Sequence, residues 1–175
     1  MPKHQINNSA YRAEKPDHSL RNCLGHFATG VTIVTYESED GERGLTINSF
    51  TSVSLDPPLV LVCLDKRSNA IEFIPDTNFA INVLHTDQRD LARHFAGRKS
   101  PELCPQWERV NDVPLLSQSL AWFRCEPWTL LDAGDHMIVV GKVTDFGTSD
   151  HDPLCFFRGE FLQLEAAPST TKLQP

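Results

Sequence analysis

The chain has 175 residues, of which 40% are hydrophobic and 22% charged, a composition typical of one soluble globular domain. The net charge of −7 disfavours nucleic acid or an anionic membrane as a partner, because both need a basic protein face. No apolar run approaches the ~20 residues of a transmembrane helix. Residues 1–17 contain no hydrophobic stretch of the signal-peptide type.

Residues 1–16 are polar and lack periodicity, which predicts a flexible arm. A helix is expected next, started by Asp17 or Ser19 and ended by glycine, with one apolar face made of Leu20, Cys23, Leu24 and Phe27. The β-branched segment 31–36 predicts a strand that returns through 43–50, with Asp40-Gly41 at the centre of the turn.

The continuous apolar run 59–64 predicts a buried strand, and Asp56-Pro57-Pro58 marks the stop before it. Ser68 is the expected N-cap of a short helix at 70–74. The pattern next predicts a strand at 79–84 and a helix capped by Thr86, with Leu91 and Phe95 paired on one face. A loop anchored by Trp107 is expected at 97–111. Three further strands are expected at 119–130, 137–146 and 154–164, and an unstructured tail at 166–175.

Short strands at close spacing, with three modest helices in the loops, favour an antiparallel barrel over a doubly wound parallel sheet. We expect one domain over residues 17–165. No GxGxxG segment follows a strand, so a Rossmann nucleotide site is not predicted.

Other chemistries lack their residue patterns. There is no GxSxG segment of a serine hydrolase and no HExxH-like spacing of a metal hydrolase. The five cysteines are dispersed, without a CxxC pair, so we expect no metal site, no disulfide framework and a reducing cytoplasm. Cys63 and Cys125 lie inside apolar strand patterns and are expected to be small core residues.

Three groups of polar residues have both a structural and a functional interpretation. The hydroxyls and amide between Thr46 and Ser54 can satisfy one another in a strand pair or face a polar or anionic ligand. Lys66-Arg67-Ser68 is either an exposed turn or a phosphate site at a helix start. His136, after Gly134-Asp135, is either a turn residue or a functional imidazole whose tautomer Asp135 fixes.

Residues 48–60 (Asn-Ser-Phe-Thr-Ser-Val-Ser-Leu-Asp-Pro-Pro-Leu-Val) resemble the signature of the short-chain flavin reductases. These small NAD(P)H:flavin oxidoreductases accompany two-component monooxygenases. Further segments similar to the family occur in the same order at 27–32, 79–84, 91–97, 134–136 and 153–161. The resemblance covers roughly residues 20–164.

The resemblance implies a mainly β, antiparallel Greek-key split barrel with a few short helices, which forms a homodimer. It implies hydride transfer from nicotinamide C4 to the N5 atom of FMN or FAD, and delivery of the reduced flavin to a separate monooxygenase. Two alternatives stay open: a flavoprotein of the same barrel that reduces another acceptor, such as a cobalt corrinoid, and a non-catalytic flavin-binding module. No arginine pair can be assigned to a 2′-phosphate, which favours NADH over NADPH.

The resemblance also implies the site. Flavin would contact Thr46, Asn48, Ser49, Ser52, Cys63, Leu64, Asp65, Ser68, Asn69, Phe95, Ala96 and Lys99. Its phosphate would lie near Ser68, and the small residues after Phe95 would permit close approach. NAD(P)H would contact His136, Phe157, Arg158, Gly159 and Phe161. His136 would orient the nicotinamide, because hydride transfer needs alignment more than a proton donor.

Overall fold

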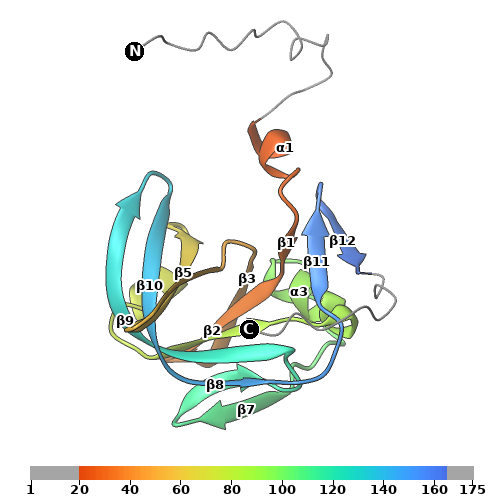
Figure 1. The fold of residues 1–175 in the computed structure, drawn as a ribbon. Helices are drawn as coiled ribbons and strands as arrows, with labels where there is room; N and C mark the ends of the chain where they lie inside the picture. Colours follow the sequence, from red (N-terminus) through yellow and green to blue (C-terminus); the bar gives the residue numbers. More distant parts are fainter. Residues whose placement is uncertain (1–19, 165–175) are drawn as a thin grey trace, which may run out of the picture.

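The structure is a computed structural model, and it describes residues 20–164. The arm and the tail predicted at 1–16 and 166–175 lie outside the described residues. The described chain is an antiparallel β barrel with a few short helices around it (Figure 1). This confirms the predicted fold class.

One curled sheet of seven strands makes the barrel, in the spatial order β3-β2-β6-β9-β10-β5-β4. All neighbours are antiparallel, and strands distant in sequence lie side by side, as in a Greek key. The strands are β2 (Thr32–Ser38), β3 (Gly41–Ile47), β4 (Thr51–Leu55), β5 (Pro58–Asp65), β6 (Phe79–Val83), β9 (Ala121–Ala133) and β10 (His136–Thr148).

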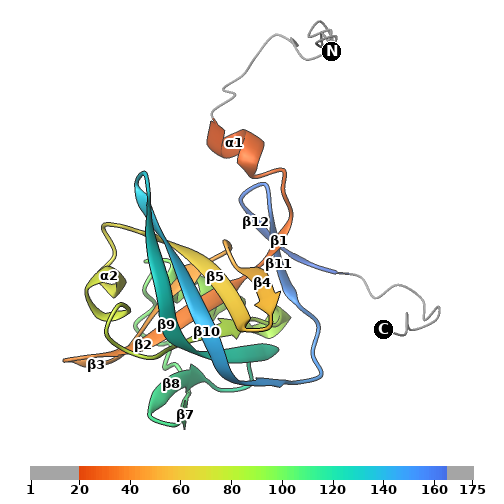
Figure 2. The same ribbon diagram turned by 60° about the vertical axis from the view of Figure 1, so that its left-hand side comes forward.

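Smaller elements surround this barrel (Figure 2). A three-stranded sheet contains β1 (Thr29–Gly30), β11 (Leu154–Phe157) and β12 (Glu160–Gln163), and a separate hairpin contains β7 (Trp107–Val110) and β8 (Val113–Leu116). The helices are α1 (Leu20–Leu24), α2 (Ala70–Phe73), the 3-10 helix η2 (Thr86–Gln88) and α3 (Arg89–Phe95).

The barrel interior is filled by aliphatic and aromatic side chains of β2, β5 and β6, with Phe79 at 0% exposure. Strand β2 is buried on both faces, because Val34 faces this interior while Ile33 joins a second cluster beneath α3. Gly141 makes room for the Phe79 ring: a Cβ at Gly141 would lie 2.7 Å from Phe79 Cζ. The interior of the barrel is therefore closely packed, and the polar residues described below lie at one end of it.

Two predicted segments prove to be hairpins. The loop expected at 97–111 ends in β7, which pairs with β8; all four residues of β8 are buried, and Thr35 Oγ1 donates to the Pro114 carbonyl. The strand expected at 154–164 is broken at Arg158-Gly159, whose φ angles are +50° and +85°. Positive φ at both central residues of a two-residue loop is typical of a type I′ turn, and it converts one predicted strand into β11 and β12.

The turn after β2 and two caps also differ from prediction. Ser38 pairs with Gly41, so Glu39-Asp40 and not Asp40-Gly41 is the centre of that turn. His85, not Thr86, caps η2: its Nδ1 accepts a hydrogen bond from the Asp87 amide. Asn69 and not Ser68 occupies the N-cap position of α2, although Ser68 Oγ accepts from the Ala70 amide at 3.2 Å.

The cap at His85 predicts a pH-dependent stability. His85 is 5% exposed, and burial is the main cause that lowers its pKa below the usual 6.5, with His151 adding to the effect and Asp87 opposing it. The unfolded chain therefore takes up this proton first, and stability contributed by neutral His85 is lost as the pH falls below about 6.5. The loss is limited to about 1.4 kcal/mol per pH unit for one proton.

The measurement is urea unfolding at pH 7.5 and 5.5. His85→Asn keeps an acceptor at the cap but does not titrate in this range. We expect the wild-type protein to lose more stability on acidification than the variant. An equal loss in both proteins would assign the pH dependence to other groups.

Candidate functional site

Polar ends of several strands meet at one end of the barrel, the upper end in Figure 1. His136, at the start of β10, lies opposite Asp65 at the end of β5. Ser49 Oγ accepts a hydrogen bond from the Cys63 amide at 2.9 Å and donates to the Cys63 carbonyl at 3.2 Å. Asn48, the residue before Ser49, lines a groove together with Arg158 and Gly159. We call this continuous surface the rim and define it as His136, Asp65, Cys63, Ser49, Asn48, Arg158 and Gly159.

The turn after β5 ties its own arginine to a carboxylate. Asp65 Oδ1 accepts hydrogen bonds from the Arg67 amide at 2.9 Å and from its Nε at 3.0 Å, while Oδ2 accepts from Nη2 at 2.6 Å. These bonds hold the pKa of Asp65 well below its usual range. Arg67, a phosphate contact in the functional interpretation of this turn, pairs with Asp65 within the turn. An anion at Ser68 would have to share Arg67 with Asp65.

The imidazole of His136 is held by its neighbour in the β9–β10 turn. His136 Nδ1 lies 2.7 Å from Asp135 Oδ1, and this contact lowers the pKa of Asp135. The Lys66 amide donates to the Asp135 carbonyl at 3.0 Å, and Lys66 Nζ to Asp132 at 2.6 Å. The turn after β5 and the β9–β10 turn therefore form one unit, which orients His136 beside Asp65.

A groove of about 970 Å³ opens at the other end of the rim, between α1 and the β11–β12 turn. Asn48, predicted for flavin, lines it together with Arg158 and Gly159, predicted for NAD(P)H. Phe156 and several residues in and after α1 complete the lining, among them Arg21, His26 and Phe27. Sequence reasoning missed these three, although Arg21 and His26 lie beside the apolar positions of the predicted helix.

Helix α3 supports the rim from the side of β3. Thr46 Oγ1 donates to the Ala92 carbonyl at 2.8 Å. Phe95 packs against Gly44, where a Cβ would lie 3.0 Å from the ring, and meets Trp107 edge to face at 6.0 Å. Phe95 is thus a packing residue as well as a predicted contact, and exposed Ala96 follows it.

Other predicted contacts have more limited access or lie away from the rim. Leu64 is 0% exposed, and it packs in the core cluster of the barrel. Ser52 is exposed on the edge strand β4, opposite Val60. Phe161 packs against Phe156, with the Arg93 guanidinium 5.9 Å from its ring centre. Asn69 and Lys99 are exposed in their turns, and Phe157 is half-buried.

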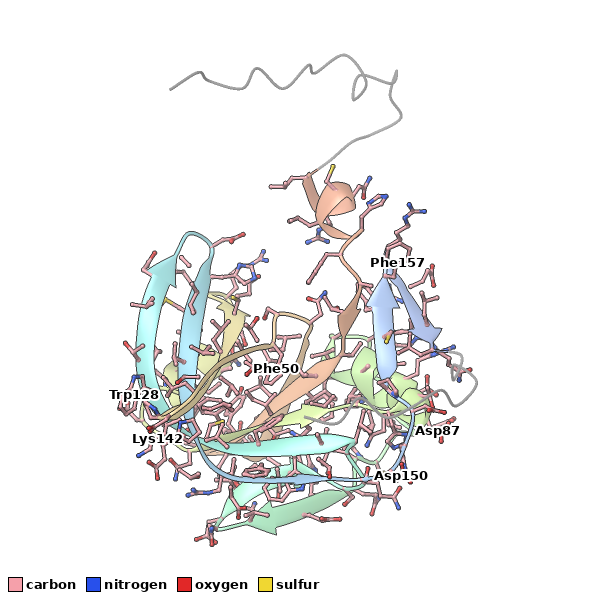
Figure 3. The ribbon with its side chains drawn as sticks, in the orientation of Figure 1. Phe50, Asp87, Trp128, Lys142, Asp150 and Phe157 are labelled. Carbon is pink, nitrogen blue, oxygen red and sulfur yellow. The ribbon has the colours of Figure 1, made fainter. Side chains whose placement is uncertain are left out.

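The residues predicted to contact NAD(P)H fall into two separate sets, His136 in one and those of the β11–β12 hairpin in the other. In Figures 1 and 2 the β9–β10 hairpin, which carries His136, and the β11–β12 hairpin stand apart, although both tips point to the same end of the molecule. Figure 3 labels Phe157 on the second hairpin. Of the predicted flavin residues, Asp65 lies opposite His136, and Ser49 is hydrogen-bonded to Cys63 on the same strand as Asp65.

Within residues 20–164, no helix is long and apolar enough to span a membrane. In the same part of the chain, no group of three or more His, Cys, Asp or Glu side chains is arranged to hold a metal ion.

Comparisons with known proteins agree with one another. The model of the flavin reductase like domain matches residues 24–165. The chain is 48% identical to an NADH-dependent FMN reductase, SmoA, of Agrobacterium fabrum, over 82% of this chain and 83% of the relative.

Two solved structures have the same fold. The styrene monooxygenase flavin reductase of Pseudomonas putida S12 superimposes with a TM-score of 0.79 at 30% identity, covering 86% of this chain and 99% of that one. The NADH:FAD oxidoreductase SgcE6 of Streptomyces globisporus, in complex with NAD and FAD fragments, gives 0.81 at 34% identity, covering 90% of this chain and 100% of that one.

Proposed function

Because the chain belongs to the flavin reductase-like domain family, we propose that it is an NADH-dependent reductase of FMN or FAD. Its reduced flavin leaves for a separate monooxygenase component. The relatives named above act on NADH and flavin or serve a monooxygenase. The reaction transfers a hydride from nicotinamide C4 to flavin N5 when both are bound.

What supports this proposal best is the rim, in which predicted flavin contacts are neighbours of predicted nicotinamide contacts: Asp65 lies opposite His136, and Asn48 lines the groove with Arg158 and Gly159. Asn48 and Ser49 offer short polar side chains beside the backbone of Cys63. Such groups can meet the polar edge of a flavin without excluding its ring. Ser68 and the N–H groups of the turn after β5 suit the flavin phosphate.

His136 then acts by position. Its contact with Asp135 fixes the ring, so the imidazole can hold the nicotinamide over the flavin in a reactive alignment. Arg158, on the opposite side of the rim, carries a positive charge for the dinucleotide phosphates. We place this chemistry in the cytoplasm, where NADH is available.

The proposed reductase is a homodimer. Large apolar side chains stay exposed on strands β4, β9 and β10 of the described chain: Leu55 is 91%, Phe146 69%, Trp128 53% and Leu131 52% exposed. Exposed apolar surface of this kind is typical of an interface. Sedimentation at micromolar concentration is expected to report about twice the 19.7 kDa chain mass. A fully active monomer would contradict the homodimer.

Steady-state kinetics tests the function itself. We expect the purified protein to oxidise NADH with saturable dependence on added FMN, FAD or riboflavin, because flavin is a substrate that leaves. A protein that retains its flavin and reduces another acceptor would turn over without added flavin. A non-catalytic flavin-binding module would oxidise no NADH under any of these conditions.

Ser68→Ala tests the position of the phosphate. A hydrogen bond to a charged group contributes about 1.5–3 kcal/mol, so we expect FMN to bind more weakly by roughly tenfold or more. Riboflavin, which has no phosphate, is expected to bind nearly as before. Fluorescence quenching measures both affinities. Equal losses for the two ligands would place the phosphate elsewhere.

His136→Ala tests the alignment role. We expect a higher KM for NADH, slower reduction of bound flavin in stopped flow, or both, because a loosely held nicotinamide spends less time in reactive alignment. Flavin affinity is expected to stay nearly constant. Weakened flavin binding with unchanged reduction of bound flavin would assign His136 to the flavin site, next to Asp65. No change in either quantity would make it a turn residue.

A further inference from the structure

The groove between α1 and the β11–β12 turn has features of a second binding subsite, beyond the part of the rim that faces the flavin ring. Its volume is about 970 Å³, and its lining comes from three segments far apart in sequence. We call it the α1 groove and define it by its lining residues: Leu20, Arg21, Asn22, Leu24, Gly25, His26, Phe27, Asn48, Phe156, Arg158 and Gly159.

The charge of the α1 groove is opposite to that of the chain. The whole protein has a net charge of −7, yet the lining includes two arginines, a histidine and no aspartate or glutamate among the described residues. In the described chain the ion pairs engage Arg43, Lys66, Arg67, Arg93 and Arg109, and neither Arg21 nor Arg158 takes part in one. The α1 groove is therefore complementary to an anion.

The two walls of the α1 groove are joined by direct contacts. The Arg158 amide donates to the Gly25 carbonyl at 2.8 Å, and the two backbones are close enough that a Cβ at Gly25 would be in van der Waals contact with Arg158 Cα at 3.6 Å. His26 Nδ1 lies 2.8 Å from the Asn22 carbonyl oxygen, and the His26 ring meets Phe157 edge to face at 6.3 Å. The Arg158 guanidinium lies 5.0 Å from the centre of the same Phe157 ring.

An aromatic surface accompanies these charges. Phe27 is 78% exposed although it lines the α1 groove, and Leu24 is 65% exposed. No residue of α1 is buried. An exposed aromatic ring beside arginines can stack on a heterocycle while the arginines bind phosphate oxygens.

We propose that the α1 groove binds the adenosine diphosphate half of a dinucleotide. Arg21 and Arg158 hold the pyrophosphate, and Phe27 stacks on the adenine. Asn48 belongs both to the α1 groove and to the rim, so a ligand bound here continues toward Ser49 and Cys63. This subsite rests on the proposed function and extends it to residues of α1.

FAD and NADH both contain an adenosine diphosphate half. Their truncated forms, FMN and reduced nicotinamide mononucleotide, lack it. Calorimetric titration of the full-length protein with ADP, FMN and FAD separates the two halves without any turnover. Initial rates with NADH and with reduced nicotinamide mononucleotide then identify the source of the adenosine diphosphate.

The test variant is Arg21→Gln, and Arg43→Gln is the matched control, since Arg43 pairs with Asp40 on the β2–β3 hairpin. We expect Arg21→Gln to weaken ADP binding about fivefold to tenfold and to leave FMN binding unchanged. If FAD binding also weakens, the flavin supplies the ligand. If KM rises for NADH but not for reduced nicotinamide mononucleotide, the pyridine nucleotide supplies it. The control is expected to change none of these quantities.

Unchanged ADP, FAD and NADH parameters in Arg21→Gln would overturn the proposal, as would equal losses for FMN and FAD. A second variant, Phe27→Ser, tests whether ADP or a second copy of the chain covers this face. Weakened ADP binding supports the proposal, whereas a loss of dimer in sedimentation with unchanged ADP binding would assign the face to a second copy of the chain.

The titrations also separate this proposal from the proposed function. A wild-type protein that binds ADP but oxidises no NADH would contradict the reductase and leave the subsite standing.

Discussion

The hydroxyl of Ser49 joins two strands that are distant in the sheet, and the site depends on this link. Four strands separate β3 from β5 in the spatial order, yet Ser49 Oγ both accepts from and donates to the backbone of Cys63. The curl of the sheet therefore brings the residues after β3 against the end of β5. Asn48 and Asp65 reach the same end of the barrel for this reason, and without that closure they would lie far apart in an open sheet.

The rim distributes charge unevenly, and this gives its two ends different affinities for anions. At the β5 end, Arg67 pairs with Asp65, Lys66 with Asp132 and His136 with Asp135. The pKa values of all three carboxyl groups are lowered, so these groups stay ionised and compete with any anionic ligand for the neighbouring cations. At the α1 end, the Arg158 guanidinium faces the Phe157 ring instead of a carboxylate. A phosphate can approach that end without displacing an acidic partner.

Strand periodicity in the sequence was sufficient to predict the barrel, because β5 and β6 are short runs with strongly apolar, buried residues. The prediction failed where tertiary contacts outweigh local pattern. Strand β8 packs against β2 and β6, and no strand was predicted for its residues. Arg158-Gly159 forms a turn because both residues take positive φ, and an arginine gives no signal of that. Ser49 was found from the family signature, but its bond to the Cys63 backbone could not be, since that bond joins segments 14 residues apart whose register no local pattern specifies.

Helix α1 shows that the helical spacing of apolar residues does not by itself predict their burial. Leu20, Leu24 and Phe27 have the spacing of one apolar helical face, yet all three are more than half exposed in the described chain. Apolar residues at helical spacing indicate that one face avoids water, but they do not identify what covers that face. The backbone bond from Arg158 to Gly25 places this face beside the rim, and the neighbouring cations favour a ligand that is both flat and anionic. An adenosine diphosphate combines these two properties, because its adenine is flat and its pyrophosphate anionic. A second protein chain would cover the apolar residues but would leave the positive charge of Arg21 and Arg158 uncompensated unless it supplied carboxylates.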